Sequence, residues 1–372
     1  MYCKKVEVEQ FRNIERAEVT FTEGVNVLAG ANAQGKSNLL EAIFYPSMGR
    51  SFRGARATEM IRFGKKQSKI RLSYRDSKRD HSIEVRIYRE KLRQVEKNGV
   101  RVDKLSDIVG SFRAVLFHPE HLSLIKESPQ DRRSYLDMAI GRIRPLYIHS
   151  LQRYNHILKQ RNALIRDAKD NRRAFDGTIE FWSDQLAEEA AVLSVMRYEY
   201  VARAERYISE SFAEMTGERE IPKISYVSSS GLKGDEKGMR EALKEKYTSL
   251  LMSSHDREIA MGSTLFGIHK DDLAIDINGH RARIYGSQGQ QRSLALAMKL
   301  AEGEICREEY GDYPVFLLDD VLSELDSERR DYLLHRIRGK QVILTGCDPD
   351  LLRGEDEVRR ILVREGCYSV VE

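Results

Sequence analysis

Eight residues near the start of the chain constrain its fold and chemistry more than any other stretch. The pattern G-x-x-x-x-G-K-[ST] is matched in full by Gly30, Ala31, Asn32, Ala33, Gln34, Gly35, Lys36 and Ser37. Residues 25–29 before it predict a short buried strand, and residues 38–44 after it predict the opening of a helix. A strand, a glycine-bearing loop and a helix in this order are typical of a loop that binds phosphate groups.

Each part of this loop has an expected role. The glycines let backbone N–H groups close around a polyphosphate, and the helix N-terminus adds partial positive charge at the same place. We expect Lys36 to bridge the β- and γ-phosphates of ATP and the Ser37 hydroxyl to ligate Mg²⁺. Asn38, the next residue, completes the expected nucleotide-binding segment.

The composition is that of a globular protein of more than one domain. The chain has 372 residues, of which 41% are hydrophobic and 32% charged, and single cores rarely grow past about 250–300 residues. Its net charge of +4 is too small to identify a polyanionic partner by itself. The four cysteines include no C-x-x-C pair, and no apolar run approaches the length of a membrane span. We therefore expect a cytoplasmic protein that has no zinc site and does not bind a membrane.

Two segments close to the loop carry candidate ligands of phosphate. Residues 4–29 predict strands joined by a turn that contains Arg12 and Asn13. These side chains lie either beside the bound nucleotide or in a turn with a solvated arginine, and the sequence leaves both alternatives open. Beyond the first helix, an irregular segment that contains Gly49 and Gly54, residues 49–56, carries three arginines. We expect this segment to contact phosphate of ATP or of nucleic acid.

The strands predicted between residues 65 and 104 carry a local excess of basic residues. Apolar side chains alternate with charged ones there, and Asn98-Gly99 predicts a hairpin turn. Lys and Arg number 14 in this segment, against 6 Asp and Glu. A charged strand face is usually only solvated, but this imbalance favours a surface for a polyanion.

Helical periodicity dominates from about residue 120 to residue 260. Strand character returns at residues 273–277, where a second Asn-Gly turn follows at Asn278-Gly279. The pattern predicts a further strand over residues 281–285. The end of the chain therefore resumes the character of its beginning.

A short polar stretch precedes the helix predicted over residues 293–300. Ser287, Gln288, Gly289 and Gln290 resemble the signature motif of ABC-type ATPases, although that motif usually has glycine where Gln288 stands. Ser287, the Gly289 backbone and the helix N-terminus would make a second anion site. In such ATPases this site caps the γ-phosphate of a nucleotide held by another subunit, which implies a homodimer around ATP. The alternative is an ordinary helix capped by Ser287.

An apolar strand predicted over residues 314–318 ends in two carboxylates, Asp319 and Asp320. Adjacent acids at the end of a buried strand are costly unless a cation or hydrogen bonds compensate. We expect Asp319 to hold Mg²⁺, directly or through water, and Asp320 to polarise the attacking water. Many ABC-type ATPases have Glu at the second position, so the shorter Asp320 predicts slow hydrolysis. Thr345, on the next predicted strand, is the candidate sensor of the γ-phosphate.

Three motifs in this order predict an α/β fold of the ABC ATPase type. Helices fill the long gap between the first two motifs, as in SMC-like heads, which are split by an inserted helical element. We expect residues 1–118 to form the first half of the ATPase domain, residues 119–262 a mainly helical lobe, and residues 263–372 the second half.

The chain resembles the RecF family of bacterial DNA-repair ATPases over essentially its full length. The segments that carry the resemblance are Phe11-Arg12-Asn13, residues 35–42, residues 49–53, Pro119-Glu120, residues 131–133, Gly267 to Leu273, residues 287–290 and Leu317 to Asp326. Ile268 and Lys270 stand where the family more often has proline and arginine.

This resemblance implies a weak ATPase of DNA repair, replication and the SOS response. Such a protein dimerises around ATP, binds duplex DNA at gaps or single-strand/double-strand junctions, and helps RecO and RecR load recombinase on single-stranded DNA. Arg142, Arg144 and Arg161 in the helical lobe are candidate DNA contacts, together with the basic strands. The main alternative is an ABC-type ATPase engine for a non-DNA partner, such as a transporter or a remodelling complex. A third hypothesis is a structural head that binds nucleotide without hydrolysing it.

Overall fold

The computed structural model describes residues 1–234, 238–348, 352 and 358–371. The chain forms two compact units. The first unit comprises Met1–Ser123, Ser211–Glu218 and Arg292–Glu372, and the second comprises Leu124–Glu210 and Arg219–Gln291. These units are defined by contacts between residues, which is a different criterion from a domain boundary along the chain. The boundaries expected near residues 118 and 262 therefore stay a prediction.

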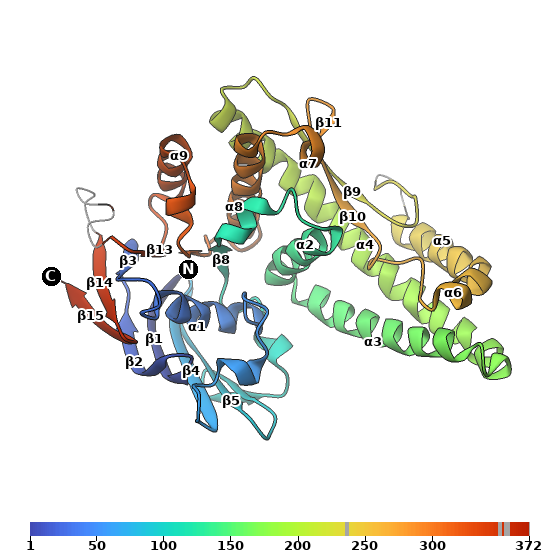
Figure 1. Cartoon of the computed structure of the whole chain (residues 1–372), viewed down its shortest axis with the longest axis horizontal. Coiled ribbons are helices and arrows are strands. Elements are labelled where there is room, and N and C mark those ends of the chain that lie inside the picture. Colours follow the sequence, from blue (N-terminus) through green and yellow to red (C-terminus); the bar gives the residue numbers. More distant parts are fainter. Residues whose placement is uncertain (235–237, 349–351, 353–357, 372) are drawn as a thin grey trace. The chain divides into compact units, whose positions relative to one another are not determined.

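A mostly parallel sheet forms the centre of the first unit. Its strand order is β15-β14-β3-β13-β12-β8, with β15 antiparallel to β14 and the other pairs parallel (Figure 1). The strands are β3 (Val25–Ala29), β8 (Ala114–Phe117), β12 (Val315–Leu318), β13 (Val342–Gly346), β14 (Arg359–Arg364) and β15 (Cys367–Val371). Every residue of β12 and β13 is buried, as expected for strands covered on both faces. Because β3, β12 and β13 are parallel, their carboxyl ends meet at one edge of the sheet.

The first unit also contains an antiparallel sheet of order β2-β1-β4-β5-β6-β7. Its strands are β1 (Tyr2–Phe11), β2 (Ile14–Thr20), β4 (Gln67–Arg75), β5 (Asp80–Tyr88), β6 (Gln94–Lys97) and β7 (Val100–Val102). Buried apolar residues alternate with exposed ones along β4 and β5, which gives the sheet one apolar face. Helix α1 (Lys36–Met48) contacts β1, β4 and β5 of this sheet and β8 and β13 of the parallel sheet. The helix that follows the phosphate loop is thus held by both sheets.

The outer face of the antiparallel sheet has mixed charge. Lys69 of β4 lies 3.8 Å from the carboxylates of both Glu9 on β1 and Glu84 on β5. Lys5 of β1 pairs with Glu7 at 2.7 Å. Of the two acids beside Lys69, Glu84 belongs to the segment 65–104 and Glu9 lies outside it, so one outside acid contributes to neutralising this lysine. The middle of this face is mixed in charge around Lys69, and a surface for a polyanion on these strands stays a prediction.

Two further helices complete the core of the first unit. They are α8 (Gln288–Tyr310), whose first residues belong to the second unit, and α9 (Ser327–Ile337). Leu296 and Leu300 of α8 and Leu333 of α9 are buried in one cluster with Phe316 of β12. Short 3₁₀ helices occupy connections of the first unit: η1 (Ala57–Met60), η2 (Leu105–Ile108), η3 (Pro119–Ser123) and η4 (Val321–Glu324).

The second unit is mainly helical and contains a small sheet. Its helices are α2 (Pro129–Ile143), α3 (Pro145–Asp167), most of α4 (Arg172–Thr216), α5 (Met239–Ser253), α6 (His255–Met261) and α7 (Ala282–Tyr285) (Figure 1). The sheet has the order β11-β10-β9, from β9 (Pro222–Val227), β10 (Asp272–Ile277) and β11 (His280–Arg281). Across the described ranges, helices with the length and apolarity to cross a membrane are absent.

The strand predicted over residues 281–285 is wrong beyond its first residue. Strand β11 pairs with β10 only through His280 and Arg281, and the chain then turns into α7. Ile284 and Tyr285 are 70% and 71% exposed. The apolar residues that suggested a strand here therefore do not pack against the core.

Buried ion pairs tie the helices of the second unit together. Arg161 of α3 is fully buried and donates to Glu258 at 2.6 Å and to the Thr264 hydroxyl at 2.8 Å. Arg142 is also buried, at 2% exposure, and Arg144 pairs with Glu199 at the surface. The predictions that Arg161 and Arg142 contact DNA are wrong, because both side chains are enclosed in the core.

Candidate nucleotide-binding site

The phosphate loop connects β3 to α1, as its sequence pattern requires. The Lys36 side chain folds back over this loop, where its Nζ donates to the carbonyl oxygens of Gly30 at 2.6 Å and Ala31 at 3.0 Å. Lys36 is only 4% exposed, so its charge is held at the loop. A cation that is already ordered loses less side-chain entropy when a phosphate binds.

Two glycines of the loop are required by its geometry. Gly35 has a φ of +117°, a conformation that L side chains rarely adopt. A Cβ on Gly30 would lie 2.3 Å from the carbonyl oxygen of Val363 on β14. A side chain at either position would therefore strain or displace the loop.

The hairpin formed by β14 and β15 supports the loop from the far end of the sequence. The Tyr368 hydroxyl donates to the Gly35 carbonyl at 2.9 Å. The Gly366 N–H donates to the Gln34 carbonyl at 2.8 Å, and the Glu365 N–H donates to the Gln34 side chain at 2.7 Å. Sequence reasoning missed these residues because no motif marks the hairpin.

The acid pair follows β12 directly. Thr345 of β13 lies between the two side chains, with its hydroxyl oxygen 3.1 Å from Asp319 and 3.2 Å from Asp320. The same oxygen accepts a hydrogen bond of 2.8 Å from the Asp320 N–H. Asp319 is 3% exposed, and Nε2 of His118 lies 3.8 Å from its carboxylate. Sequence reasoning also missed His118, which follows β8 at the same edge of the sheet.

A pocket of about 180 Å³ extends from the loop to Asp320, the second acid of the pair. It is lined by Asn32, Ala33, Gly35, Lys36, Ser37, Asn38, Arg53 and Asp320. Arg53 comes from the arginine-bearing segment and donates to the Asn38 side chain at 2.8 Å. Residues of the phosphate loop, the arginine-bearing segment and the acid pair, which are distant in sequence, thus face one cavity.

Arg12 is bound by a carboxylate instead of solvent. Its Nε and Nη2 each donate to the fully buried Glu41 of α1 at 2.9 Å. Asn13 donates to the Gln34 carbonyl at 3.2 Å and accepts from the Asn38 side chain at 2.8 Å. The solvated-arginine alternative is therefore wrong. Both residues support the loop and its helix, and direct contact of either with the nucleotide stays a prediction.

The stretch at residues 287–290 lies in the second unit, where it begins α8. Ser287 Oγ accepts from the Gln290 N–H at 3.2 Å, and the Gln290 side chain accepts from the Ser287 N–H at 2.7 Å. These reciprocal bonds form a capping box. Ser287 is exposed, and Gly289 lies in the first turn of the helix. The expected contact of Ser287, Gly289 and Gln290 with a nucleotide of another subunit stays a prediction.

The residues at the loop fit Mg²⁺ chemically. This ion prefers oxygen ligands and is commonly held by one or two carboxylates together with substrate phosphates and water. Ser37 and Asp320 line the same pocket, and Asp319 is adjacent to Asp320. The structure thus brings a hydroxyl and carboxylates to the place where phosphates are expected.

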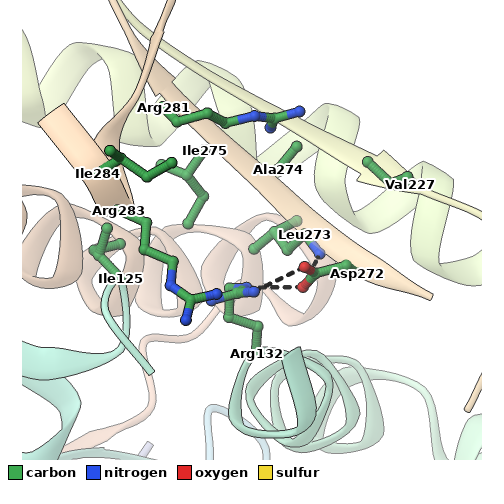
Figure 2. A pocket seen from close by; sticks show the side chains of 10 residues that line it. All are labelled: Ile125, Arg132, Val227, Asp272, Leu273, Ala274, Ile275, Arg281, Arg283 and Ile284. Carbon is green, nitrogen blue, oxygen red and sulfur yellow. Dashed lines mark hydrogen bonds and ion pairs between the residues drawn. The ribbon is translucent and has the colours of Figure 1, made fainter. Parts of the chain in front are cut away.

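A separate cleft of about 290 Å³ lies in the second unit (Figure 2). Its walls are mainly apolar and include Val227, Ile275 and Ile284. Figure 2 shows the Arg132 guanidinium facing the Asp272 carboxylate, and the two groups pair at 2.7 Å. The cleft is distinct from the pocket at the phosphate loop, because the two share no lining residue.

Comparisons with known proteins point to one family. The family described as "RecF/RecN/SMC N terminal domain" matches residues 2–369. A protein of Thermoanaerobacter pseudethanolicus described as "DNA replication and repair protein RecF" is 39% identical over 357 residues, covering 95% of this chain and 96% of the relative. The protein of the same description from Bacillus subtilis is 37% identical over 360 residues, covering 95% and 96%.

Solved structures give the same answer for the fold. One described as the recombination mediator protein RecF-ATP in the RecFOR pathway has a TM-score of 0.89 and 35% identity, covering 100% of this chain and 99% of its own. Another, described as RecF-ATPrS of that pathway, has a TM-score of 0.93 and 35% identity, covering 100% and 98%. An Smc head domain from Pyrococcus furiosus, with a TM-score of 0.55 and 18% identity, shares the fold, covering 100% and 96%. The predicted α/β, SMC-like ATPase head is confirmed.

Proposed function

Because this chain belongs to the RecF family of DNA replication and repair proteins, we propose that it is an ATP-controlled DNA-binding protein of recombinational repair. The observation that carries the proposal is the pocket in which the phosphate loop, Arg53 and Asp320 meet. A cytoplasmic location and action beside RecO and RecR are parts of the same proposal, and they rest on the family and on the pathway named for the related structures.

The chain's own residues can perform each step of ATP binding and hydrolysis. Lys36 and the N–H groups of the loop bind the phosphates, and Ser37 and Asp319 would hold Mg²⁺, which neutralises phosphate charge when bound. Asp320 orients and polarises the attacking water. Thr345 positions the acid pair, because its hydroxyl accepts from the Asp320 N–H and can donate to either carboxylate. The short Asp320 side chain makes hydrolysis slow, so the ATP-bound state is long-lived.

Dimerisation around ATP is the second part of the proposal. The helix α8 begins at residue 288 with exposed Ser287 as its cap, and a helix N-terminus favours negative charge. Ser287→Arg would place a bulky side chain at this end. The variant should bind ATP as a monomer but fail to dimerise, as measured by light scattering with ATP. Dimerisation that survives the substitution contradicts this part of the proposal.

DNA binding that depends on ATP is the third part, and gapped or junction-containing duplex is the proposed substrate. The test is fluorescence anisotropy of a labelled gapped duplex with ATP, with ADP and without nucleotide, over a series of salt concentrations. We expect tight binding only with ATP and an affinity that falls steeply with salt, because contacts to phosphate release counterions. Binding that ignores the nucleotide, or no binding, contradicts the proposal.

One observation favours the alternative of an ATPase engine for a non-DNA partner. The basic strands of the antiparallel sheet pair with acids of neighbouring strands, as Lys69 does with Glu9 and Glu84. A surface neutralised in this way has little affinity for a polyanion. ATP-dependent dimers that bind none of the DNA substrates would support this alternative.

A further inference from the structure

Phe63 and Leu92 have the most exposed large hydrophobic side chains in the described part of the chain, at 96% and 90%. Phe63 lies between η1 and β4, and Leu92 lies between β5 and β6. The two loops are bonded to each other, because Arg89 donates from its backbone N–H to the Lys66 carbonyl at 3.1 Å and from its Nε to the Lys65 carbonyl at 2.8 Å. Residues 62–66 and 89–93 therefore form one surface, here called the tip surface.

The backbone holds Phe63 outward at the corner of a tight turn. The Lys65 N–H donates to the Arg62 carbonyl at 3.0 Å, which closes a four-residue turn around Phe63 and Gly64. Gly64 takes the left-handed conformation, with a φ of +77°. The ring contributes no burial to the core, so the fold gives no reason for an aromatic residue here.

The apolar side chains of the tip surface are surrounded by cations. Its ten residues include one acid, Glu90, and six basic residues: Arg62, Lys65, Lys66, Arg89, Lys91 and Arg93. Arg62 pairs with Glu15 at 3.4 Å, and the other five form no ion pair within the ranges that the structure describes. This end of the sheet differs from its middle, where Lys69 is neutralised by two carboxylates.

We propose that the tip surface binds DNA where a duplex meets a gap, with Phe63 stacked on the exposed terminal base and Leu92 packed beside it. The cations would contact phosphates on both sides of the junction. Aromatic side chains stack on bases of any sequence, and only an unstacked or terminal base offers its face. This inference rests on the proposed DNA-binding function and names the surface that selects the junction.

The connection of the tip surface to the nucleotide site favours DNA over an anionic membrane, which apolar side chains among cations could also bind. The Arg62 N–H donates to the Gln10 carbonyl at 2.8 Å, and its guanidinium donates to the Asn13 carbonyl at 3.4 Å. Asn13 in turn contacts Gln34 and Asn38 at the phosphate loop. A ligand on the tip surface is thus two residues away from the ATP pocket, as expected for a ligand whose binding is linked to ATP.

The test compares two DNA molecules with ATP present: a gapped duplex, and a continuous duplex closed by hairpins at both ends. Phe63→Ala should weaken binding to the gapped duplex about tenfold and change binding to the closed duplex less than about twofold. Phe63→Trp should bind the gapped duplex as the wild type does. Ile221→Ala is the matched control, because Ile221 is 73% exposed in the second unit and should affect neither DNA.

The outcomes separate this inference from the proposed function. Wild-type protein that binds neither DNA overturns both. If the wild-type protein binds gapped DNA, two results for Phe63→Ala overturn only the role of the tip surface. One is unchanged binding, and the other is an equal loss of affinity for both DNA molecules. The inference is also overturned if the wild type binds phosphatidylglycerol vesicles and Phe63→Ala loses that binding while it keeps its binding to DNA. That result would assign the tip surface to a membrane.

Discussion

The Tyr368 hydroxyl donates a hydrogen bond of 2.9 Å to the backbone carbonyl oxygen of Gly35. The two residues are 333 positions apart, and Gly35 holds the left-handed conformation on which the loop depends. Burial raises the pKa of Tyr368, so its hydroxyl stays a hydrogen-bond donor at any physiological pH. The end of the chain thus fixes the shape of a loop near its beginning.

Tyr368→Phe should weaken ATP binding about three- to tenfold, because one net hydrogen bond that orders the loop is removed. Isothermal titration calorimetry with ATP measures the change. Tyr285→Phe is the matched control, since Tyr285 is 71% exposed in the second unit. An unchanged affinity in Tyr368→Phe would mean that the loop keeps its geometry without this bond.

Thr345→Val should lower the rate of ATP hydrolysis at least about tenfold while changing ATP affinity less than about threefold. The substitution keeps the volume but removes the hydroxyl that accepts from the Asp320 N–H and lies between the two carboxylates. The buried groups left without a partner would reorient. Thr345→Ser keeps the hydroxyl and should restore most of the rate in a steady-state assay. Equal activity of the Val and Ser variants would contradict a positioning role.

Asp320→Asn should slow hydrolysis and prolong the ATP-bound dimer, because the amide cannot polarise the attacking water as a carboxylate does. The lifetime of the dimer after dilution into ADP, followed by energy transfer between labelled subunits, should rise at least about tenfold. Asp331→Asn is the control, because that side chain is 72% exposed on α9. A structural head that never hydrolyses ATP would show the same lifetime in all three proteins.

The sequence predicted those parts of the site whose chemistry depends on local spacing. The loop at residues 30–37 and the acids after β12 each consist of neighbours along the chain, so their pattern is visible without a fold. Tyr368 and His118 reach the site only because β15 and β8 belong to the same sheet as β3 and β12. A lone tyrosine or histidine carries no signal of such a position.

The pairing of charged side chains was the least predictable property, because the partner of a charged residue can lie far away in the sequence. Arg161 was expected to contact DNA, yet its buried partner Glu258 lies 97 positions away. Lys69 likewise pairs with Glu9 of the neighbouring strand β1, which a count of charges over residues 65–104 does not include. In contrast, the fold class was predictable because three motifs in a fixed order require a parallel sheet with helices packed against it.

Acid should destabilise the second unit through His269. Burial lowers the pKa of His269 to about 4, and its ring contacts the Tyr154 hydroxyl at 2.6 Å and the Thr264 carbonyl at 3.1 Å. Histidine in an unfolded chain has a pKa near about 6.5. Between these values the unfolded chain binds a proton that the folded chain does not, so the free energy of unfolding falls as the pH is lowered from about 6.5 to about 4. At the acid end the loss is up to about 3 kcal/mol.

The contribution of His269 is isolated by urea unfolding of the wild type and of His269→Gln at about pH 7.5, 6.0 and 5.0. The other titrating groups are common to both proteins, so their effects cancel in the comparison. One of these groups is Asp271, whose pKa is raised by burial. A raised carboxyl pKa makes the free energy of unfolding fall as the pH rises, which is opposite in sign to the effect of His269. The variant should be less stable at about pH 7.5 and should lose less stability on acidification. Parallel pH profiles would show that His269 becomes protonated in the folded protein as readily as in the unfolded chain.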